Sequence, residues 1–252
     1  MTQMKNLYSA IKILKLSEIA PYVLVAISLF GLFFFQMTST LLVSLYSGMN
    51  FIRDAISILV YLPYGWMQTM AFYIFGISIL SLAAILYFKI RVKLNIVAIL
   101  FAVMALCLFI VGSFPTKLPG APSTLTSTIH GCAATIVGIM FPLACFFIAR
   151  VLRAYKFRYL YIYTIVAGMF QVLFIIFGML FLPGMTGIYE RVLLWNGQIW
   201  IIVICINFIF LEVKDRLSAS SWKRLVTQLS IAGAAYAYGA ILLPLCLPLI
   251  YR

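Results

Sequence analysis

The stretch of sequence that decides the fold is residues 94–114, LNIVAILFAVMALCLFIVGSF. It is 21 residues long and contains no Lys, Arg, Asp or Glu. A helix needs about 20 mostly apolar residues to cross a hydrocarbon core about 30 Å thick. We therefore predict that this stretch is a membrane-spanning α-helix.

Five similar apolar runs and a softer seventh run accompany it along the chain. The chain is 65% hydrophobic and only 9% charged, whereas a soluble domain averages about 25% charged residues. We therefore expect an all-α fold, a polytopic transmembrane helical bundle of six or seven spans that forms one membrane domain over residues 1–252. The other predicted spans are Ile19–Gln36 with a continuation toward Leu45, Met67–Phe88, Ile129–Ala149, Leu160–Leu182, Val192–Leu211 and the softer Leu225–Tyr251.

Lys and Arg are distributed unevenly among the gaps between these runs. Fourteen of them lie in the N-terminal tail and in the gaps after the second, fourth and sixth runs. The alternate gaps and the C-terminus hold only Arg53, Lys117, Arg191 and Arg252. The positive-inside rule then predicts a cytoplasmic N-terminus. The net charge of +13 is thus explained by topology and anionic lipid head groups, and no basic domain indicates nucleic acid as a partner.

Polar side chains are costly in a membrane protein, so their placement is the best clue to a site. They gather on the predicted outer face, and arginine and histidine there suit an anionic head group. If the first outer loop folds over the sixth run, Asp54 could meet Arg191 and Arg53 could meet Glu190; the alternative is simple solvated loop charge. The candidate ligand-binding residues are Arg53, Asp54, Ser57, Lys117, His130, Glu190, Arg191 and Trp195.

Two segments of the outer side invite a structural interpretation. The apolar stretch Ile52–Tyr61 is predicted to be an interfacial helix. His130 is predicted to begin the fourth span, because Ser127 and Thr128 before it suit a helix start. His130 is either a proton carrier or head-group ligand, or a boundary residue that bonds to a neighbouring loop.

Other residues of the spans favour packing over chemistry. Gly131, Ala134 and Gly138 recur at helical spacing, which predicts close approach of a second helix. Trp195 shares a helix face with Arg191, and as an aromatic residue near a span end it is typical of the interfacial belt.

Catalytic and metal-binding patterns are poor. The sequence has no nucleophile elbow, zinc-protease motif or phosphate loop, and its five cysteines show no metal spacing. A serine nucleophile with His130 and Asp54 is conceivable, but any chain with several outer serines would offer as much. The sequence therefore predicts no cofactor and no metal, and it favours a protein that is not an enzyme.

Several short blocks follow one another along the chain: Arg53–Ser57 with Leu59, Gly65–Gln68, Phe72–Gly76, Gly112–Thr116, Ile129–Gly131 and Glu190–Arg191 with Trp200. Taken together, these blocks resemble a bacterial membrane family catalogued as domain of unknown function 998. The resemblance covers a six-helix core of about residues 19–211 and implies a helical bundle in the bacterial cytoplasmic (inner) membrane, with recurrent polar residues on one face and no settled activity. Lys117 stands where the family usually has an acid, which removes an acid–base partner at that position. The run at about 225–251 adds a span to the usual six.

Three functions follow as hypotheses from these observations. The first is a protein that binds or helps to transport a lipid or other amphiphile at an outward-facing polar site, with membrane lipids as partners. The second is a structural or assembly subunit, with a protein partner or a second copy of the chain. The third is an intramembrane hydrolase or transferase.

The topology yields a direct prediction. In a background without cysteines, a single cysteine placed in Pro115–Thr128 should react with a membrane-impermeant thiol reagent in intact cells, because this gap lies outside. Reaction only after permeabilisation would contradict the orientation.

Overall fold

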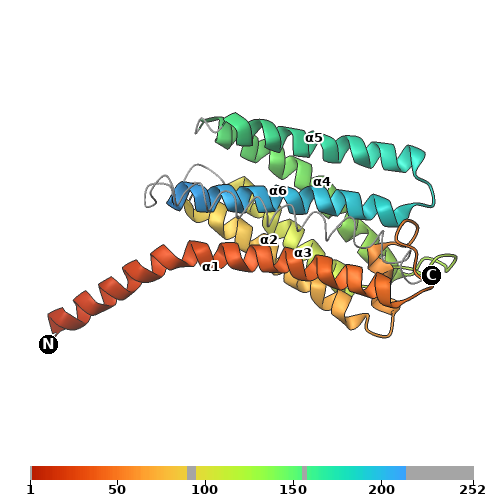
Figure 1. The fold of residues 1–252 in the computed structure, drawn as a ribbon, viewed down its shortest axis with the longest axis horizontal. Helices are drawn as coiled ribbons and strands as arrows, with labels where there is room; N and C mark the ends of the chain where they lie inside the picture. The colour runs from red at the N-terminus through yellow and green to blue at the C-terminus, as the bar shows by residue number, and fades with distance from the viewer. Residues whose placement is uncertain (1, 90–94, 155–157, 214–252) are drawn as a thin grey trace.

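The computed structural model describes residues 2–89, 95–154 and 158–213, and these segments are all-helical (Figure 1). Six of their helices are long and apolar enough to cross a membrane, which confirms the predicted fold class. The predicted seventh span, Leu225–Tyr251, lies outside the described residues. The elements are α1 (Thr2–Leu45), the 3-10 helix η1 (Ile56–Tyr61), α2 (Trp66–Lys89), α3 (Asn95–Ser113), α4 (Leu125–Ala154), α5 (Arg158–Phe181) and α6 (Thr186–Val213).

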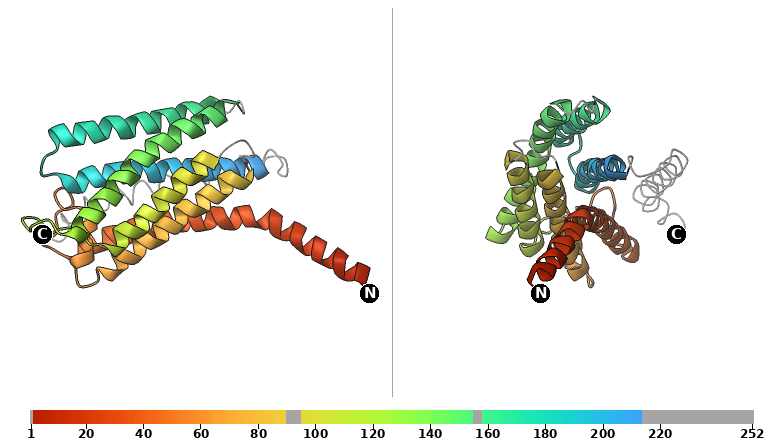
Figure 2. Two further views of the ribbon diagram at one scale, coloured as in Figure 1. Left: turned by 180° about the vertical axis from the view of Figure 1, so that it is seen from behind. Right: turned by 90° about the vertical axis from the view of Figure 1, so that its left-hand side faces the viewer.

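The helices follow one another around the bundle. Each of α1 to α4 packs against the next helix in the chain, and α6 contacts both α5 and α1. Seen end-on in Figure 2, α1 to α5 form an arc, and α6 lies between the two ends of that arc. This arrangement gives α6 neighbours from both halves of the chain.

Trp200 packs α6 against three helices of the arc, α3, α4 and α5. Its side chain is fully buried, and its ring lies 6.0 Å from Phe101 of α3 and 5.7 Å from Phe141 of α4. Its indole N–H donates to Thr164 Oγ1 of α5 at 3.1 Å. One side chain thus joins four helices, through aromatic packing and one hydrogen bond that satisfies its polar atom.

The first two helices approach closely at Gly31. A Cβ atom at this position would lie 2.6 Å from Ser78 Cβ and 2.8 Å from the Ile74 carbonyl oxygen, both on α2. The close approach lets Ser78 Oγ donate to the Ser28 carbonyl at 2.5 Å. Small residues that permit such contacts are typical of helix pairs in lipid, where no hydrophobic effect drives the helices together.

Helices α4 and α6 each begin about one turn or more before the residue that hydropathy predicted. Helix α6 begins at Thr186 rather than Val192, and α4 begins at Leu125 rather than near His130. At the start of α4, Thr124 Oγ1 accepts from the Ser127 N–H at 3.2 Å, and Ser127 Oγ accepts from the Thr124 N–H at 2.9 Å. This reciprocal cap stabilises a helix start within a polar segment. Hydropathy places the start too late, because it detects only the apolar residues that follow.

The helix predicted over Ile52–Tyr61 is present over Ile56–Tyr61 only, as a 3-10 helix. The segment holds the shorter 3-10 helix η1, whose Ile56, Ser57 and Leu59 are buried. It packs against α1, α2 and α6. Because it has no charged face to leave in water, it folds into the end of the bundle instead of lying on a membrane surface.

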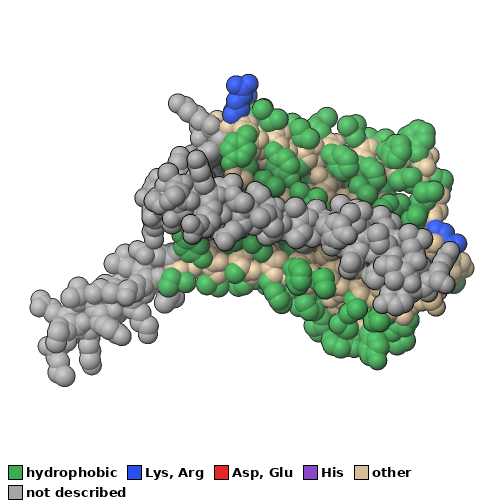
Figure 3. Space-filling model, in the orientation of Figure 1, with side chains coloured by type: hydrophobic (Ala, Val, Ile, Leu, Met, Phe, Trp, Pro, Cys, Tyr) green, Lys and Arg blue, Asp and Glu red, His purple; other side chains and the backbone are tan. Residues whose placement is uncertain are grey.

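The outer surface of the bundle is that of a membrane protein. Figure 3 shows hydrophobic side chains over the coloured part of one face, with Lys and Arg only at its two ends. On α5, large apolar side chains such as Leu173, Met179 and Leu180 are exposed. An apolar surface of this extent requires lipid or another protein to cover it.

The central position of Trp200 makes its side chain important for stability. Trp200→Ala should lower the free energy of unfolding by about 3–5 kcal/mol, because it leaves a cavity and an unpaired Thr164 hydroxyl. Trp66→Ala is the matched control, since Trp66 is 64% exposed, and it should change stability by no more than about 0.5 kcal/mol. Thermal unfolding of the detergent-solubilised chain measures both, and equal losses would contradict the central role.

Candidate functional site

The first turn of α6 binds the backbone of the loop between α1 and α2, which the sequence predicted to be the first outer loop. The Gly187 N–H donates to the Arg53 carbonyl at 3.1 Å, and the Ile188 N–H donates to the Ile52 carbonyl at 2.9 Å. The first N–H groups of any α-helix lack partners within the helix. Here the loop supplies them, so the loop is fixed across the end of α6.

Arg191, one turn further along α6, strengthens this junction. Its side chain is only 2% exposed, and its Nη1 donates to the carbonyl oxygens of Phe51 and Asp54, both at 2.9 Å. The guanidinium carbon lies 4.3 Å from the centre of the Phe51 ring, in cation–π geometry. Gly187 makes room for the junction, since a Cβ there would lie 2.5 Å from the Asp54 carbonyl oxygen.

Glu190 binds the loop a few residues further on. Its Oε2 accepts from the Ile56 N–H at 2.8 Å, at the start of η1. We call these contacts of α6 with residues 51–56 the clasp. The predicted folding of the loop over the sixth helix is therefore present, but the partners of Glu190 and Arg191 differ from the predicted ones.

The partners in the clasp are backbone groups rather than the side chains of Arg53 and Asp54. Arg191 uses the carbonyl of Asp54, while the Asp54 carboxylate accepts from the Asn50 N–H at 2.6 Å within the loop. The Arg53 side chain is exposed. Backbone groups prevail because an otherwise unpaired carbonyl in a buried loop is itself costly, and a guanidinium reaches two of them at once.

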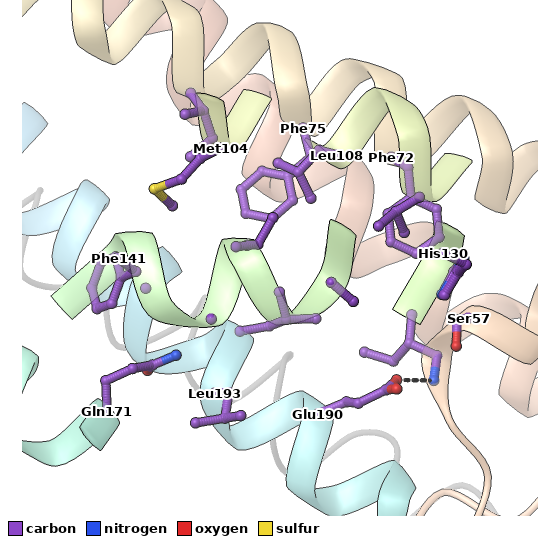
Figure 4. Close-up of a pocket in the computed structure, with 18 of the residues that line it drawn as sticks. Ser57, Phe72, Phe75, Met104, Leu108, His130, Phe141, Gln171, Glu190 and Leu193 are labelled. Atoms are coloured by element: carbon purple, nitrogen blue, oxygen red, sulfur yellow. Dashed lines mark hydrogen bonds between the residues drawn. The ribbon is translucent and has the colours of Figure 1, made fainter. Parts of the chain in front are cut away.

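A cavity of about 150 Å³ lies beneath the clasp, inside the bundle. Figure 4 shows Ser57, His130 and Glu190 toward one end of it and Met104, Phe141 and Gln171 toward the other. Most of its lining is apolar, so the cavity has a polar end and an apolar remainder. The lining comes from η1, α2, α3, α4, α5 and α6, and its other members include Phe72, Phe75, Leu108, Val137, Leu194 and Ile201.

His130 forms one wall of the polar end. It is 4% exposed, and its Nδ1 lies 2.7 Å from the Phe114 carbonyl oxygen at the end of α3. A carbonyl oxygen can only accept, so Nδ1 carries the proton. The sequence analysis gave two alternatives for His130, and this contact is the second of them, a bond to a neighbouring loop. It fixes the imidazole ring beside the cavity.

The cavity opens to the side of the bundle beside α4. Ala134 and the half-buried Gly138 line the cavity, and Ala134 is exposed. Near the other end of α4, helices α4 and α5 are close together, since a Cβ on Gly168 of α5 would lie 3.0 Å from Cys145 Cβ of α4. Figure 2 (left) shows α4 and α5 together at that end and apart at the other.

The predicted role of the small residues on α4 is therefore wrong. A Cβ on Gly131 would meet nothing within 4 Å, and one on Gly138 would meet only Ile175 Cδ1, at 3.9 Å. At Gly131 and Gly138 no backbone atom of a second helix lies within 4 Å of the Cβ position, and the contact at Gly138 is made by a side chain of α5. The small side chains instead leave the mouth of the cavity open.

Trp195 lies apart from the cavity. It is buried, and its indole N–H donates to Gln36 Oε1 of α1 at 3.0 Å. The belt interpretation of Trp195 is therefore wrong, because a belt residue faces the membrane interface. Its hydrogen bond joins α6 to α1, and Asn196 joins α6 to α5 in the same way, through Gln171 Oε1 at 2.9 Å.

The structure thus sorts the eight predicted site residues into groups, and whether any of them binds a ligand stays a prediction. Ser57, His130 and Glu190 line the cavity, and Glu190 also belongs to the clasp. Gln171, which sequence reasoning missed, lines the cavity as well. A single amide within the apolar run of α5 was the available signal. The other predicted residues are Asp54 and Arg191 in the clasp, Trp195 against α1, and the exposed Arg53 and Lys117.

These features define a polytopic α-helical membrane protein with a small cavity under the loop between α1 and α2. A family model described as "Protein of unknown function (DUF998)" matches residues 24–207, and the chain belongs to that family. No curated protein and no solved structure matches the chain.

The clasp leads to a stability prediction. Arg191→Ala should lower the free energy of unfolding by about 2–5 kcal/mol, because the two carbonyls it binds lose a charged donor in a buried site. Arg53→Ala removes an exposed arginine from the same loop and should cost no more than about 0.5 kcal/mol. Thermal unfolding in detergent compares them, and an effect of Arg191→Ala as small as the control would mean that the clasp is not structurally important.

Proposed function

We propose that this protein binds a lipid or other amphiphile drawn from the bilayer. The observation that carries the proposal is the shape of the cavity, which is apolar over most of its lining, polar at the end beneath the clasp, and open at its side. An amphiphile has the same division into an apolar chain and a polar head. Pockets for such ligands are typically apolar with a few placed polar groups.

The depth of the mouth supports a ligand that arrives from lipid. Gly138 lies thirteen residues after the start of α4, which is about 20 Å along a helix that rises 1.5 Å per residue. The hydrocarbon core is about 30 Å thick. An opening at this depth between membrane-spanning helices faces acyl chains rather than water.

The distribution of charge supports an outward position for the polar end. The clasp belongs to the same end of the bundle as the gap that holds Lys117, since the Tyr61 hydroxyl donates to the Thr116 carbonyl at 2.5 Å. By the positive-inside rule this end is the outer one. In the bacterial cytoplasmic membrane, the polar head of a bound amphiphile would then lie near the outer leaflet.

The contacts of the polar end favour binding over hydrolysis. Ser57, His130 and Glu190 share the cavity, which is the set of groups a serine hydrolase uses. However, His130 donates its Nδ1 proton to the Phe114 carbonyl, and Glu190 Oε2 is held by the Ile56 amide. A catalytic relay needs the carboxylate to orient the histidine ring, and these two bonds direct both groups elsewhere.

Blocking the mouth should abolish binding. Gly138→Phe places a ring in the opening, where a Cβ meets only one side-chain atom, so the fold should tolerate it. Gly131→Phe is the matched control, because Gly131 lies on the same helix, faces open space and does not line the cavity. After exhaustive detergent exchange, quantitative mass spectrometry should find about one retained lipid or amphiphile per wild-type or Gly131→Phe chain.

The Gly138→Phe variant should retain several-fold less. Equal retention by Gly138→Phe and Gly131→Phe would show that the retained molecules cover the surface and would count against the cavity as a binding site. Thermal unfolding of both variants confirms that the comparison is made between folded proteins.

A further inference from the structure

We infer that the ligand is a single-chain amphiphile whose small head donates hydrogen bonds, as a hydroxyl or an ammonium group does. The inference rests on the proposed function, since it names the chemistry of the amphiphile that the cavity would hold. It follows from three observations: the hydrogen-bonding character of the polar end, the position of the nearby cations, and the volume of the cavity.

The polar end presents mainly acceptors. The Glu190 carboxylate can accept about four hydrogen bonds. Two backbone N–H groups of η1, those of Ile56 and Ser57, bond to it, which leaves capacity for about two more in a side chain that lines the cavity. His130 has spent its Nδ1 proton on the Phe114 carbonyl, so the second nitrogen of the neutral ring is an acceptor. The Ser57 hydroxyl can serve in either direction. A ligand that matches this end must bring donors.

The described cations of this end of the protein are directed elsewhere. Among the residues that the structure describes, no Lys or Arg lines the cavity. Arg191 donates to two loop carbonyls, its buried Nη2 has no hydrogen-bond partner in the described part of the chain, and it does not line the cavity. Arg53 and Lys117 are exposed. The anionic head group expected from the sequence would therefore meet the Glu190 carboxylate rather than a cation.

The volume limits the size of the head. A cavity of about 150 Å³ is large enough for a molecule about the size of benzene. It can hold a hydroxyl or ammonium group and the first few methylene groups of one chain. The remainder of the chain would leave through the mouth beside Ala134 and lie among the lipids. A phosphodiester head with two acyl chains would not fit.

Competition between matched single-chain probes tests the inference. The full-length chain, in a detergent with a bulky sugar head, is incubated with equimolar dodecylamine and dodecyltrimethylammonium, and separately with dodecanol and dodecyl methyl ether. Within each pair the chain and charge are the same, and the methylated partner lacks the hydrogen-bond donor but is also larger. The alcohol and its ether differ by only one methyl group, so this pair separates the donor from head size most strictly. Dodecanoate supplies the anionic arm, and free ethanolamine supplies a donor head without a chain. Native mass spectrometry reads the ratio of bound probes.

We expect dodecylamine and dodecanol to exceed their methylated partners by about tenfold, the ratio that one hydrogen bond to a charged acceptor supports. Ethanolamine should not displace them. Glu190→Gln should reduce the preference to less than about threefold, while its amide oxygen can still accept from Ile56. Asp54→Asn makes the same chemical change outside the cavity lining and should keep the preference.

Other outcomes overturn the inference at separate points. Equal binding within both pairs, or strongest binding of dodecanoate, would overturn the head-group chemistry and leave amphiphile binding intact. If no probe binds wild type better than it binds Gly138→Phe, the proposed function fails as well. Displacement by ethanolamine alone would identify a soluble amine, rather than an amphiphile, as the ligand. Should Glu190→Gln fail to fold, the wild-type ratios decide the question.

Discussion

The buried guanidinium of Arg191 holds together the end of the bundle at which α6 begins. It donates to two carbonyl oxygens of the loop between α1 and α2, and a charge buried at that depth is tolerated only with such partners. Its neighbour Glu190 binds the first amide of η1. Together they fix η1 over the bundle, and η1 supplies Ile56 and Ser57 to the cavity. The roof of the cavity therefore depends on two charged side chains, Glu190 and Arg191. Both bind backbone groups in the clasp.

The same rule governs the rest of α6. In a bilayer each polar side chain must find its partner within the protein, and α6 finds them on helices from both halves of the chain. Trp195 donates to α1, while Asn196 and Trp200 donate to α5. Hydrogen bonds between membrane helices contribute only about 0.6–2 kcal/mol each. These hydrogen bonds matter mainly for orientation. Each one fixes the rotation of α6 about its own axis and therefore which of its side chains face the cavity.

The amino-acid sequence predicted the six spans of the described residues well, because crossing lipid demands long apolar runs and such runs are visible without a structure. The start of α6 was predicted six residues too late, since Glu190 and Arg191 look like the end of a span until the loop that binds them is seen. The cavity could not be predicted. Phe72 and Met104 line it, yet nothing in the sequence distinguishes them from residues that face lipid.

The sorting of the polar residues was equally beyond the sequence. Ser57, His130 and Glu190 come together because the clasp brings η1 to the start of α6, a contact between segments more than 130 residues apart. Lys117 is also polar and lies at the same end of the bundle as these three residues, but its side chain remains exposed in its loop. Composition and spacing locate such residues at one end of a bundle, whereas their directions depend on backbone hydrogen bonds that only the folded chain defines.

Because α4 and α5 are splayed beside the cavity, the concentration that matters for a ligand of this site would be its concentration in the membrane. A molecule that enters beside Ala134 comes from a thin, two-dimensional solvent, so its supply is set by its mole fraction among the lipids. A long-chain compound that is almost absent from water can still be abundant there. Occupancy would then follow the composition of the membrane, and it would change when the cell remodels its lipids even if the aqueous phase stayed constant. Because the roof and the side opening are formed by different elements, such exchange would not require the clasp to release.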